Sequence, residues 1–179
     1  MADGSVIFRL AEECGFEHFG PLEISALEFL PEVRQMCAAN LCQAYNRNWT
    51  CPPACGTLEE IAAKTKEFHK GILVQTTAEL DDDFDYDTMT KACRMQNARF
   101  QKLISKLRGH CSRLLPMGAG GCKICEVCAY PDEKCRFPDM AFPSMEAYGL
   151  FVSAVCEKSG VKYYYGKGTI TYTCCLLYE

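Results

Sequence analysis

The chain has 179 residues, 14 of them cysteine, and a formal net charge of −4. The negative charge argues against a nucleic-acid-binding protein, because such proteins carry a basic face. No apolar run approaches the roughly 18 residues that a membrane span requires. The first residues lack the basic start and long apolar stretch of a signal peptide, so we expect a cytoplasmic protein in a reducing compartment. The length fits a single domain over residues 1–179.

In the first half of the chain, short helices are predicted to alternate with short strands. We expect a helix over residues 5–14, an alternating strand over residues 22–29 and a helical turn from residue 31. Thr57 and Glu60 form a capping-box pattern that predicts the start of a helix, and Gly71 is expected to end that helix. The β-rich run at residues 72–77 then predicts a strand.

The second half is predicted to contain a long helix and a terminal hairpin. The acidic run at residues 81–87 complements the dipole at the start of a helix over residues 88–108. The apolar stripe expected on that helix consists of Met89, Cys93, Phe100, Leu103, Ile104 and Leu107. Further elements are expected as a strand over residues 113–117, a helix over 144–158 and a hairpin that pairs 161–165 with 169–177. We therefore predict an α+β fold: an antiparallel or mixed sheet, helices packed on one face of it and two cysteine-rich metal-binding loops.

Eight of the cysteines fall into two compact groups of four. The first cysteine group is Cys37, Cys42, Cys51 and Cys55, and the second cysteine group is Cys122, Cys125, Cys128 and Cys135. We predict that these eight residues are the ligands of a metal cofactor. Four thiolates suit a zinc ion and an iron–sulfur cluster equally well in number, so the spacing must separate the two.

The spacing of the second cysteine group favours an iron–sulfur cluster. Its first three members follow at successive two-residue intervals, as in bacterial ferredoxins, whereas zinc sites usually use two separate C-x2-C pairs. The fourth, Cys135, comes after six residues and is not followed directly by proline, so it either closes its own cluster or reaches another. Gly118, Gly120 and Gly121 are expected to let backbone amides approach this cluster.

The first cysteine group is less specific. Its last two members enclose three residues, where a zinc-ribbon knuckle has two, and its opening C-x4-C interval resembles that of plant-type ferredoxins. An iron–sulfur cluster is again favoured, and zinc is the alternative. Two [4Fe–4S] clusters in one chain would form a path for electrons.

The two groups lie within longer motifs that resemble a known family. Residues 36–60, residues 118–138 and the adjoining residues 144–149 are similar to the hallmarks of a cysteine-rich family described as predicted metal-binding proteins. This family, a domain of unknown function, is found in anaerobic bacteria and archaea, and the resemblance covers nearly the whole chain. It implies a cytoplasmic, oxygen-sensitive metal protein and specifies no reaction.

The remaining six cysteines are Cys14, Cys93, Cys111, Cys156, Cys174 and Cys175. Cys93 and Cys156 are expected to pack as small hydrophobic side chains on helix faces. Cys174 and Cys175 are neighbours on a predicted strand and point to opposite faces, so at most one of them easily joins a given site. That one is a candidate replacement ligand or redox thiol.

Three other side chains are candidates for tuning the cysteine groups. Arg34 and Arg136 stand beside them, where a cation would stabilise the more negative, reduced cluster; an ordinary salt bridge is the alternative. Trp49, two residues before Cys51, is predicted to shield the cluster from water.

The sequence thus predicts an iron–sulfur protein that acts in electron transfer or redox chemistry of anaerobic metabolism. Two alternatives remain: an iron–sulfur enzyme whose cluster is open to substrate, and a zinc-stabilised interaction or metal-scaffold module. The expected partner is a redox protein or a small-molecule substrate, and neither nucleic acid nor a membrane is expected.

Overall fold

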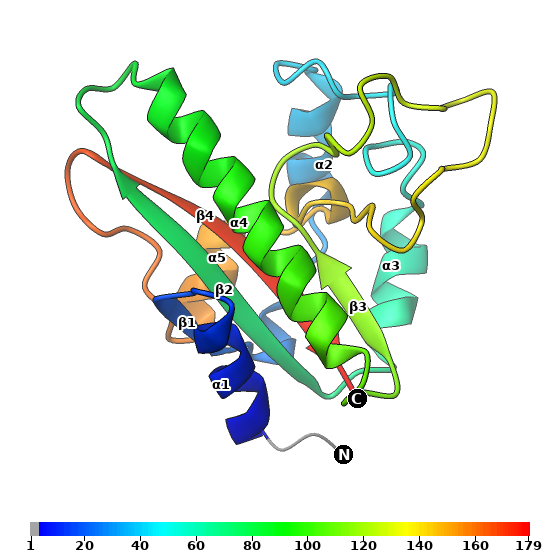
Figure 1. Cartoon of the computed structure of the whole chain (residues 1–179). Helices are drawn as coiled ribbons and strands as arrows, with labels where there is room; N and C mark the ends of the chain where they lie inside the picture. Colours follow the sequence, from blue (N-terminus) through cyan, green and yellow to red (C-terminus); the bar gives the residue numbers. More distant parts are fainter. Residues whose placement is uncertain (1–3) are drawn as a thin grey trace.

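The fold is built on one antiparallel sheet, described by a computed structural model for residues 4–179 (Figure 1). Its strands run in the order β1–β2–β4–β3. Their bounds are His18–Pro21 for β1, Lys70–Glu79 for β2, Leu114–Met117 for β3 and Thr169–Tyr178 for β4. The central pair, β2 and β4, is in register along its whole length, from Lys70 opposite Tyr178 to Glu79 opposite Thr169. The predicted α+β class is confirmed.

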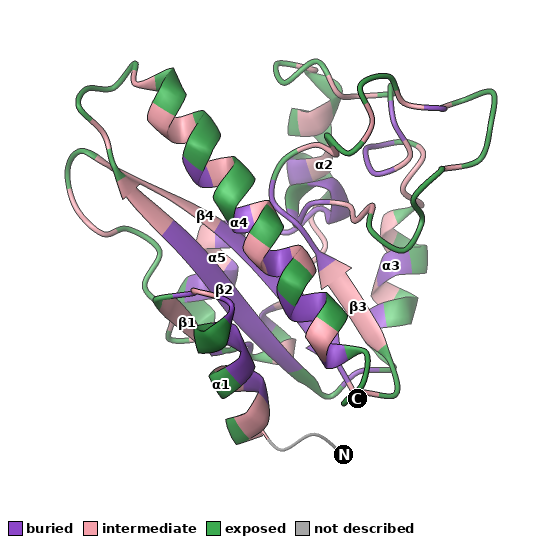
Figure 2. Ribbon diagram, in the orientation of Figure 1, coloured by how far each residue is buried: buried purple, intermediate pink, exposed green. Residues whose placement is uncertain are grey.

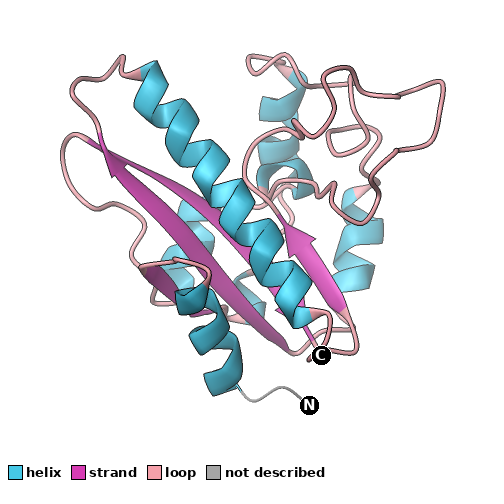
Figure 3. Ribbon diagram, viewed as in Figure 1, coloured by secondary structure: helices cyan, strands magenta, loops and turns pink. Residues whose placement is uncertain are grey.

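Helices cover both faces of this sheet (Figures 1 and 3). On one face, α1 (Gly4–Glu13) and the long α4 (Tyr86–Leu107) pack against side chains such as Ile72, Val74 and Leu176. On the other face, α3 (Leu58–Thr65), α5 (Val152–Lys158) and the 3-10 turn η2 (Glu146–Tyr148) pack against side chains such as Leu73 and Leu177. The prediction of helices on a single face is wrong, because alternate residues of the two central strands are apolar on both sides (Figure 2).

The predicted strand over residues 22–29 is also wrong. Residues Ile24–Ala26 form the 3-10 turn η1, and Phe29 makes only an isolated bridge to Leu150. The carboxylate of Glu23 accepts hydrogen bonds from the backbone amide and hydroxyl of Ser25, a local bond that competes with strand pairing. The helical turn expected from residue 31 is confirmed as α2, Pro31–Ala38.

Gly71 does not end a helix. The helix that begins at the confirmed capping box ends at Thr65, and Gly71 lies inside β2. A Cβ at Gly71 would lie 2.6 Å from Leu22 Cδ2 and 3.0 Å from Leu177 Cδ2, so this position admits only glycine because two core side chains meet there.

The last predicted helix and hairpin both differ from the structure. The expected helix over residues 144–158 divides into η2 and α5 around Gly149, whose φ of +80° is left-handed. Residues 161–165 form no strand, because β2 and β3 already occupy both edges of β4. This segment is instead held to the sheet by side chains: the Tyr165 hydroxyl donates to Gln75 Oε1 at 2.8 Å, and the Tyr165 ring stacks on His18.

Candidate metal centre

The loops that carry the two cysteine groups contact each other at one end of the molecule (Figures 1 and 3). Residues 39–57 join α2 to α3, and residues 118–145 join β3 to η2. Trp49 Nε1 donates to the Glu133 carbonyl at 3.0 Å, and the Tyr130 hydroxyl donates to Asn46 Oδ1 at 2.6 Å. The Trp49 and Tyr130 rings meet edge to face at 4.9 Å. The two loops therefore pack as one unit.

The first cysteine group is anchored by the elements on either side of it. Cys37 lies in the last turn of α2, and its thiol donates to the Glu146 carbonyl at 3.8 Å. The Cys55 thiol donates to the next carbonyl of η2, that of Ala147, at 3.6 Å. Both ends of the group are thus held against η2.

All four thiols of this group are close enough to at least one other for their charges to interact. Burial raises the pKa of Cys37, and the neighbouring thiols of Cys42 and Cys51 raise it further. Burial likewise raises the pKa of Cys51, with smaller contributions from Cys42 and Cys55. Thiols that repel one another as thiolates are stabilised when a cation binds them, because the cation cancels that repulsion.

Arg34 provides a fixed positive charge beside the first cysteine group. Its Nη2 donates to Cys55 Sγ at 3.3 Å, and its Nη1 donates to the Gly56 carbonyl at 3.1 Å. Burial raises the pKa of Cys55, and the guanidinium partly offsets this rise. Arg34 therefore contacts a predicted ligand directly, as its position in the sequence suggested.

All four thiols of the second cysteine group line one small pocket, together with Trp49 and Arg136. Burial raises the pKa of Cys122, and the other three thiols of the group add to that rise. Trp49 belongs to the loop of the first group but lines the pocket of the second, so the shielding predicted for it stays a prediction and concerns the second group. Arg136 donates to the Val127 carbonyl at 3.0 Å and lies 4.0 Å from a Glu133 carboxylate oxygen.

Glycines bring the two groups together. A Cβ at Gly121 would lie 3.4 Å from Ala44 Cβ and 3.9 Å from Cys51 Sγ, so the backbone before Cys122 passes beside the loop of the first group. Gly120, with a φ of +70°, faces Cys93 of α4 instead. Within residues 4–179, no three His, Cys, Asp or Glu side chains are already arranged to hold a metal ion, so ligation by the two groups stays a prediction.

The cysteines outside the groups divide into buried and accessible ones. Cys174 and Cys175 are fully buried in the two separate core layers, which confirms that they face opposite sides of the sheet. Burial strongly raises the pKa of both thiols. Cys156 is buried as expected, with a pKa raised to about 11 by burial. Cys93 differs from the prediction, because it is only partly buried and lines a cavity.

A protein-family model described as "Predicted metal-binding protein (DUF2284)" matches residues 21–178. The chain belongs to this DUF2284 family. The match includes both cysteine groups, all the loop contacts described above and nearly the whole sheet. No curated protein and no solved structure matches the chain. In the part that the structure describes, no helix of this DUF2284 protein combines the length and apolar character needed to cross a bilayer.

Proposed function

We propose that this DUF2284 protein is an iron–sulfur protein that binds two [4Fe–4S] clusters and transfers electrons in anaerobic metabolism. Cys37, Cys42, Cys51 and Cys55 would hold one cluster, and Cys122, Cys125, Cys128 and Cys135 the other. The observation that carries the proposal is the lining of one pocket by all four thiols of the second set, in a loop that packs against the loop of the first set.

The surroundings of the thiols fit an iron–sulfur group. The donor set is entirely sulfur, which suits iron–sulfur clusters and zinc and disfavours magnesium or calcium. Arg34 places a cation on Cys55, and its buried Nε has no hydrogen-bond partner among residues 4–179. Such a cation favours the more negative, reduced state. Trp49 limits the access of water to the second group. When bound, the clusters would supply one-electron redox chemistry, and the chain would supply ligation, charge and exclusion of water.

The test is iron and sulfide analysis of protein purified without oxygen. We expect about eight irons per chain, as two [4Fe–4S] clusters require, and a brown colour that bleaches with dithionite. Cys42→Ser and Cys128→Ser should each lose about four irons, because each removes one ligand from a different cluster. Cys111→Ser is the matched control, since Cys111 is partly buried and lies outside both groups. Colourless protein that carries stoichiometric zinc would overturn the proposal and favour a zinc-stabilised module.

A cavity beside Cys122 favours a second candidate, an iron–sulfur enzyme whose cluster is open to substrate. Cys122 and Ile124 line both this cavity and the pocket of the second cysteine group. A molecule in the cavity would therefore lie next to a predicted ligand. Electron transfer between proteins does not require a cavity, whereas catalysis does.

A further inference from the structure

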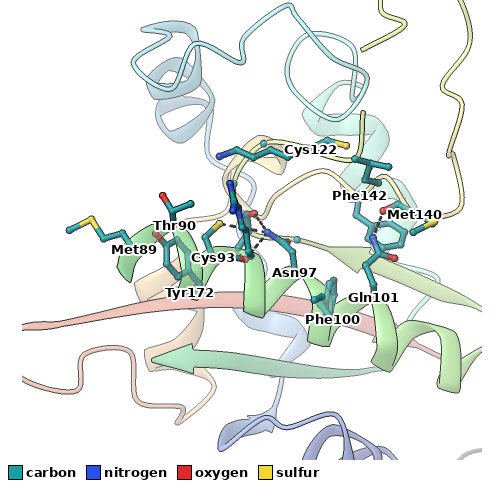
Figure 4. A pocket seen from close by; sticks show the side chains of 18 of the residues that line it. Met89, Thr90, Cys93, Asn97, Phe100, Gln101, Cys122, Met140, Phe142 and Tyr172 are labelled. Atoms are coloured by element: carbon teal, nitrogen blue, oxygen red, sulfur yellow. Dashed lines mark hydrogen bonds between the residues drawn. The ribbon is translucent and has the colours of Figure 1, made fainter. Parts of the chain in front are cut away.

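A cavity of about 470 Å³ lies between α4 and the backbone of residues 118–124 (Figure 4). This volume falls within the range of small-molecule sites. One wall consists of α4 side chains, and Tyr172 of β4 also contributes to the lining. The other wall is largely backbone, because three of its first four residues are glycine. Two hydrogen bonds hold the backbone around the cavity in place. Gly118 N donates to the Pro143 carbonyl at 2.8 Å, and Gln101 of α4 donates to the Met140 carbonyl.

The two ends of the cavity differ in chemistry. At one end, Phe100 and Phe142 meet edge to face with ring centroids 6.2 Å apart, beside the half-exposed Met140. At the other end lie Cys93, Arg94 and Lys123, with Lys123 close enough to Cys93 for its charge to lower that thiol's pKa against the rise caused by burial. Figure 4 shows Phe100 and Cys93 at separate positions along α4, with Asn97 between them and Tyr172 beside Cys93.

The charges that line the cavity are all positive. Arg94 and Lys123 are its charged residues, and no Asp or Glu is among the described residues that line it. Both cations are exposed, and among residues 4–179 neither forms a salt bridge. Asn97 lies at mid-length with its amide donors already engaged: its Nδ2 donates to the Cys93 carbonyl at 3.0 Å and, at a longer 3.4 Å, to the Ala119 carbonyl, which leaves the cations as the anion-binding groups.

We propose that this cavity binds a small organic anion, with its apolar body against Phe142 and Met140 and its oxyanion, a carboxylate or phosphate, against Arg94 and Lys123. The apolar end supplies binding free energy by burial, and the two cations supply orientation and preference for negative charge. Because Cys122 lines the cavity, the ligand would lie beside the second cysteine group. The role of this ligand as a redox substrate rests on the proposed function, whereas its binding to the cavity does not.

The test uses 1-naphthylacetate, 1-naphthyl phosphate and the neutral 1-naphthaleneethanol as probes of anaerobically purified, metal-loaded protein. We expect a dissociation constant of about 1 mM or lower for at least one anion. The better anion identifies the head group. The neutral probe should bind about fivefold to tenfold more weakly, and this preference should decrease with added salt. Equal binding of neutral and anionic probes, or no binding, would overturn the proposal.

Two sets of variants locate the site. The double variant Arg94→Gln/Lys123→Gln should abolish the preference for the anions, whereas Lys102→Gln, which removes a cation elsewhere on α4, should preserve it. Ala98→Trp places a large ring in the cavity and should prevent binding of all three probes, whereas Ser105→Trp, at an exposed position of α4 outside the cavity, should not. Binding that survives Ala98→Trp would refute this location.

Iron analysis of the same samples keeps the two proposals separate. Full iron content without probe binding would refute the ligand site and leave the iron–sulfur assignment intact. Probe binding to protein that contains no iron would refute the assignment and support the ligand site. With both present, a probe-dependent change in the EPR spectrum of the reduced protein would support contact between the ligand and the second cluster; an unchanged spectrum would refute a substrate role.

Discussion

Gly149 packs against Leu30 at the start of α2, the helix that carries Cys37 of the first cysteine group, so its replacement tests whether this contact supports the group. Its φ is +80°, and a Cβ there would lie 2.8 Å from Leu58 Cδ2 and 3.1 Å from the Leu30 carbonyl oxygen. Its own carbonyl accepts a hydrogen bond from Leu30 N at 2.8 Å. Leu30 is the N-cap of α2, the helix whose last turn contains Cys37, and Gly149 follows directly after η2.

The cost of Gly149→Ala has two parts. The left-handed backbone costs about 1–2 kcal/mol once a Cβ is present. The clash with Leu58 and with the rigid Leu30 backbone adds about 1–3 kcal/mol, as overpacking of a core typically does. We therefore expect Gly149→Ala to lower the free energy of unfolding by about 2–5 kcal/mol.

Gly160→Ala is the matched control. Gly160 has a similar φ of +68°, but no atom lies within 4 Å of the position of its Cβ. It should therefore lose only the backbone part, about 1–2 kcal/mol. Urea unfolding of the metal-free variants measures both values, provided that the denaturant slopes agree. Equal losses in the two variants would refute the steric reasoning. Gly149→Ala should also reduce metal retention by the first cysteine group, which Gly160→Ala should preserve.

Two further predictions concern that group. Arg34→Gln removes the cation that contacts Cys55 and should lower the reduction potential of a bound cluster on the order of 60 mV, which is a tenfold change in the equilibrium constant for one electron. A potential equal to that of Arg47→Gln, an exposed control in the loop of the first cysteine group, would contradict this. Because burial raises the pKa of Cys37, Cys51 and Cys55, these thiols are protonated at neutral pH and must release protons to bind a metal. Cobalt(II) titrations of the metal-free protein should show an affinity that rises about tenfold per pH unit for each proton released, and a flat profile between about pH 6 and about pH 8 would refute it.

Local signals in the sequence predicted the elements whose causes are local. Thr57 and Glu60 form both hydrogen bonds of the capping box, at 3.2 Å and 2.8 Å, and α3 begins there. The second half of the long helix α4 follows its predicted apolar stripe from Phe100 to Leu107, whereas Ala92 and Gln96 are buried in its first half in place of Met89 and Cys93. Asp85 from the acidic run caps the first turn by accepting from Thr88 N. The four thiols of the second cysteine group line one pocket, as their short spacing suggests, because little chain separates them.

Features that depend on distant contacts could not be predicted in the same way. Gly71 was read as a helix stop, but glycine is required there because Leu22 and Leu177 approach it from elsewhere in the chain. The predicted terminal hairpin failed because β4 pairs with β2, where Thr77 and Thr171 are joined by a hydroxyl hydrogen bond of 3.0 Å. Cys93 was assigned to packing because the sequence does not reveal that residues 118–124 pass over α4 and leave a cavity.

The two cysteine groups depend on each other's loops, which argues against treating them as independent sites. Trp49 comes from the first loop and lines the pocket of the second group, while Gly121 comes from the second loop and passes beside Ala44 and Cys51 of the first. Ordering either loop around a metal therefore fixes part of the other site and reduces the conformational entropy still to be lost there. Metal binding at the two groups should consequently be cooperative, and loss of one metal should weaken retention of the second.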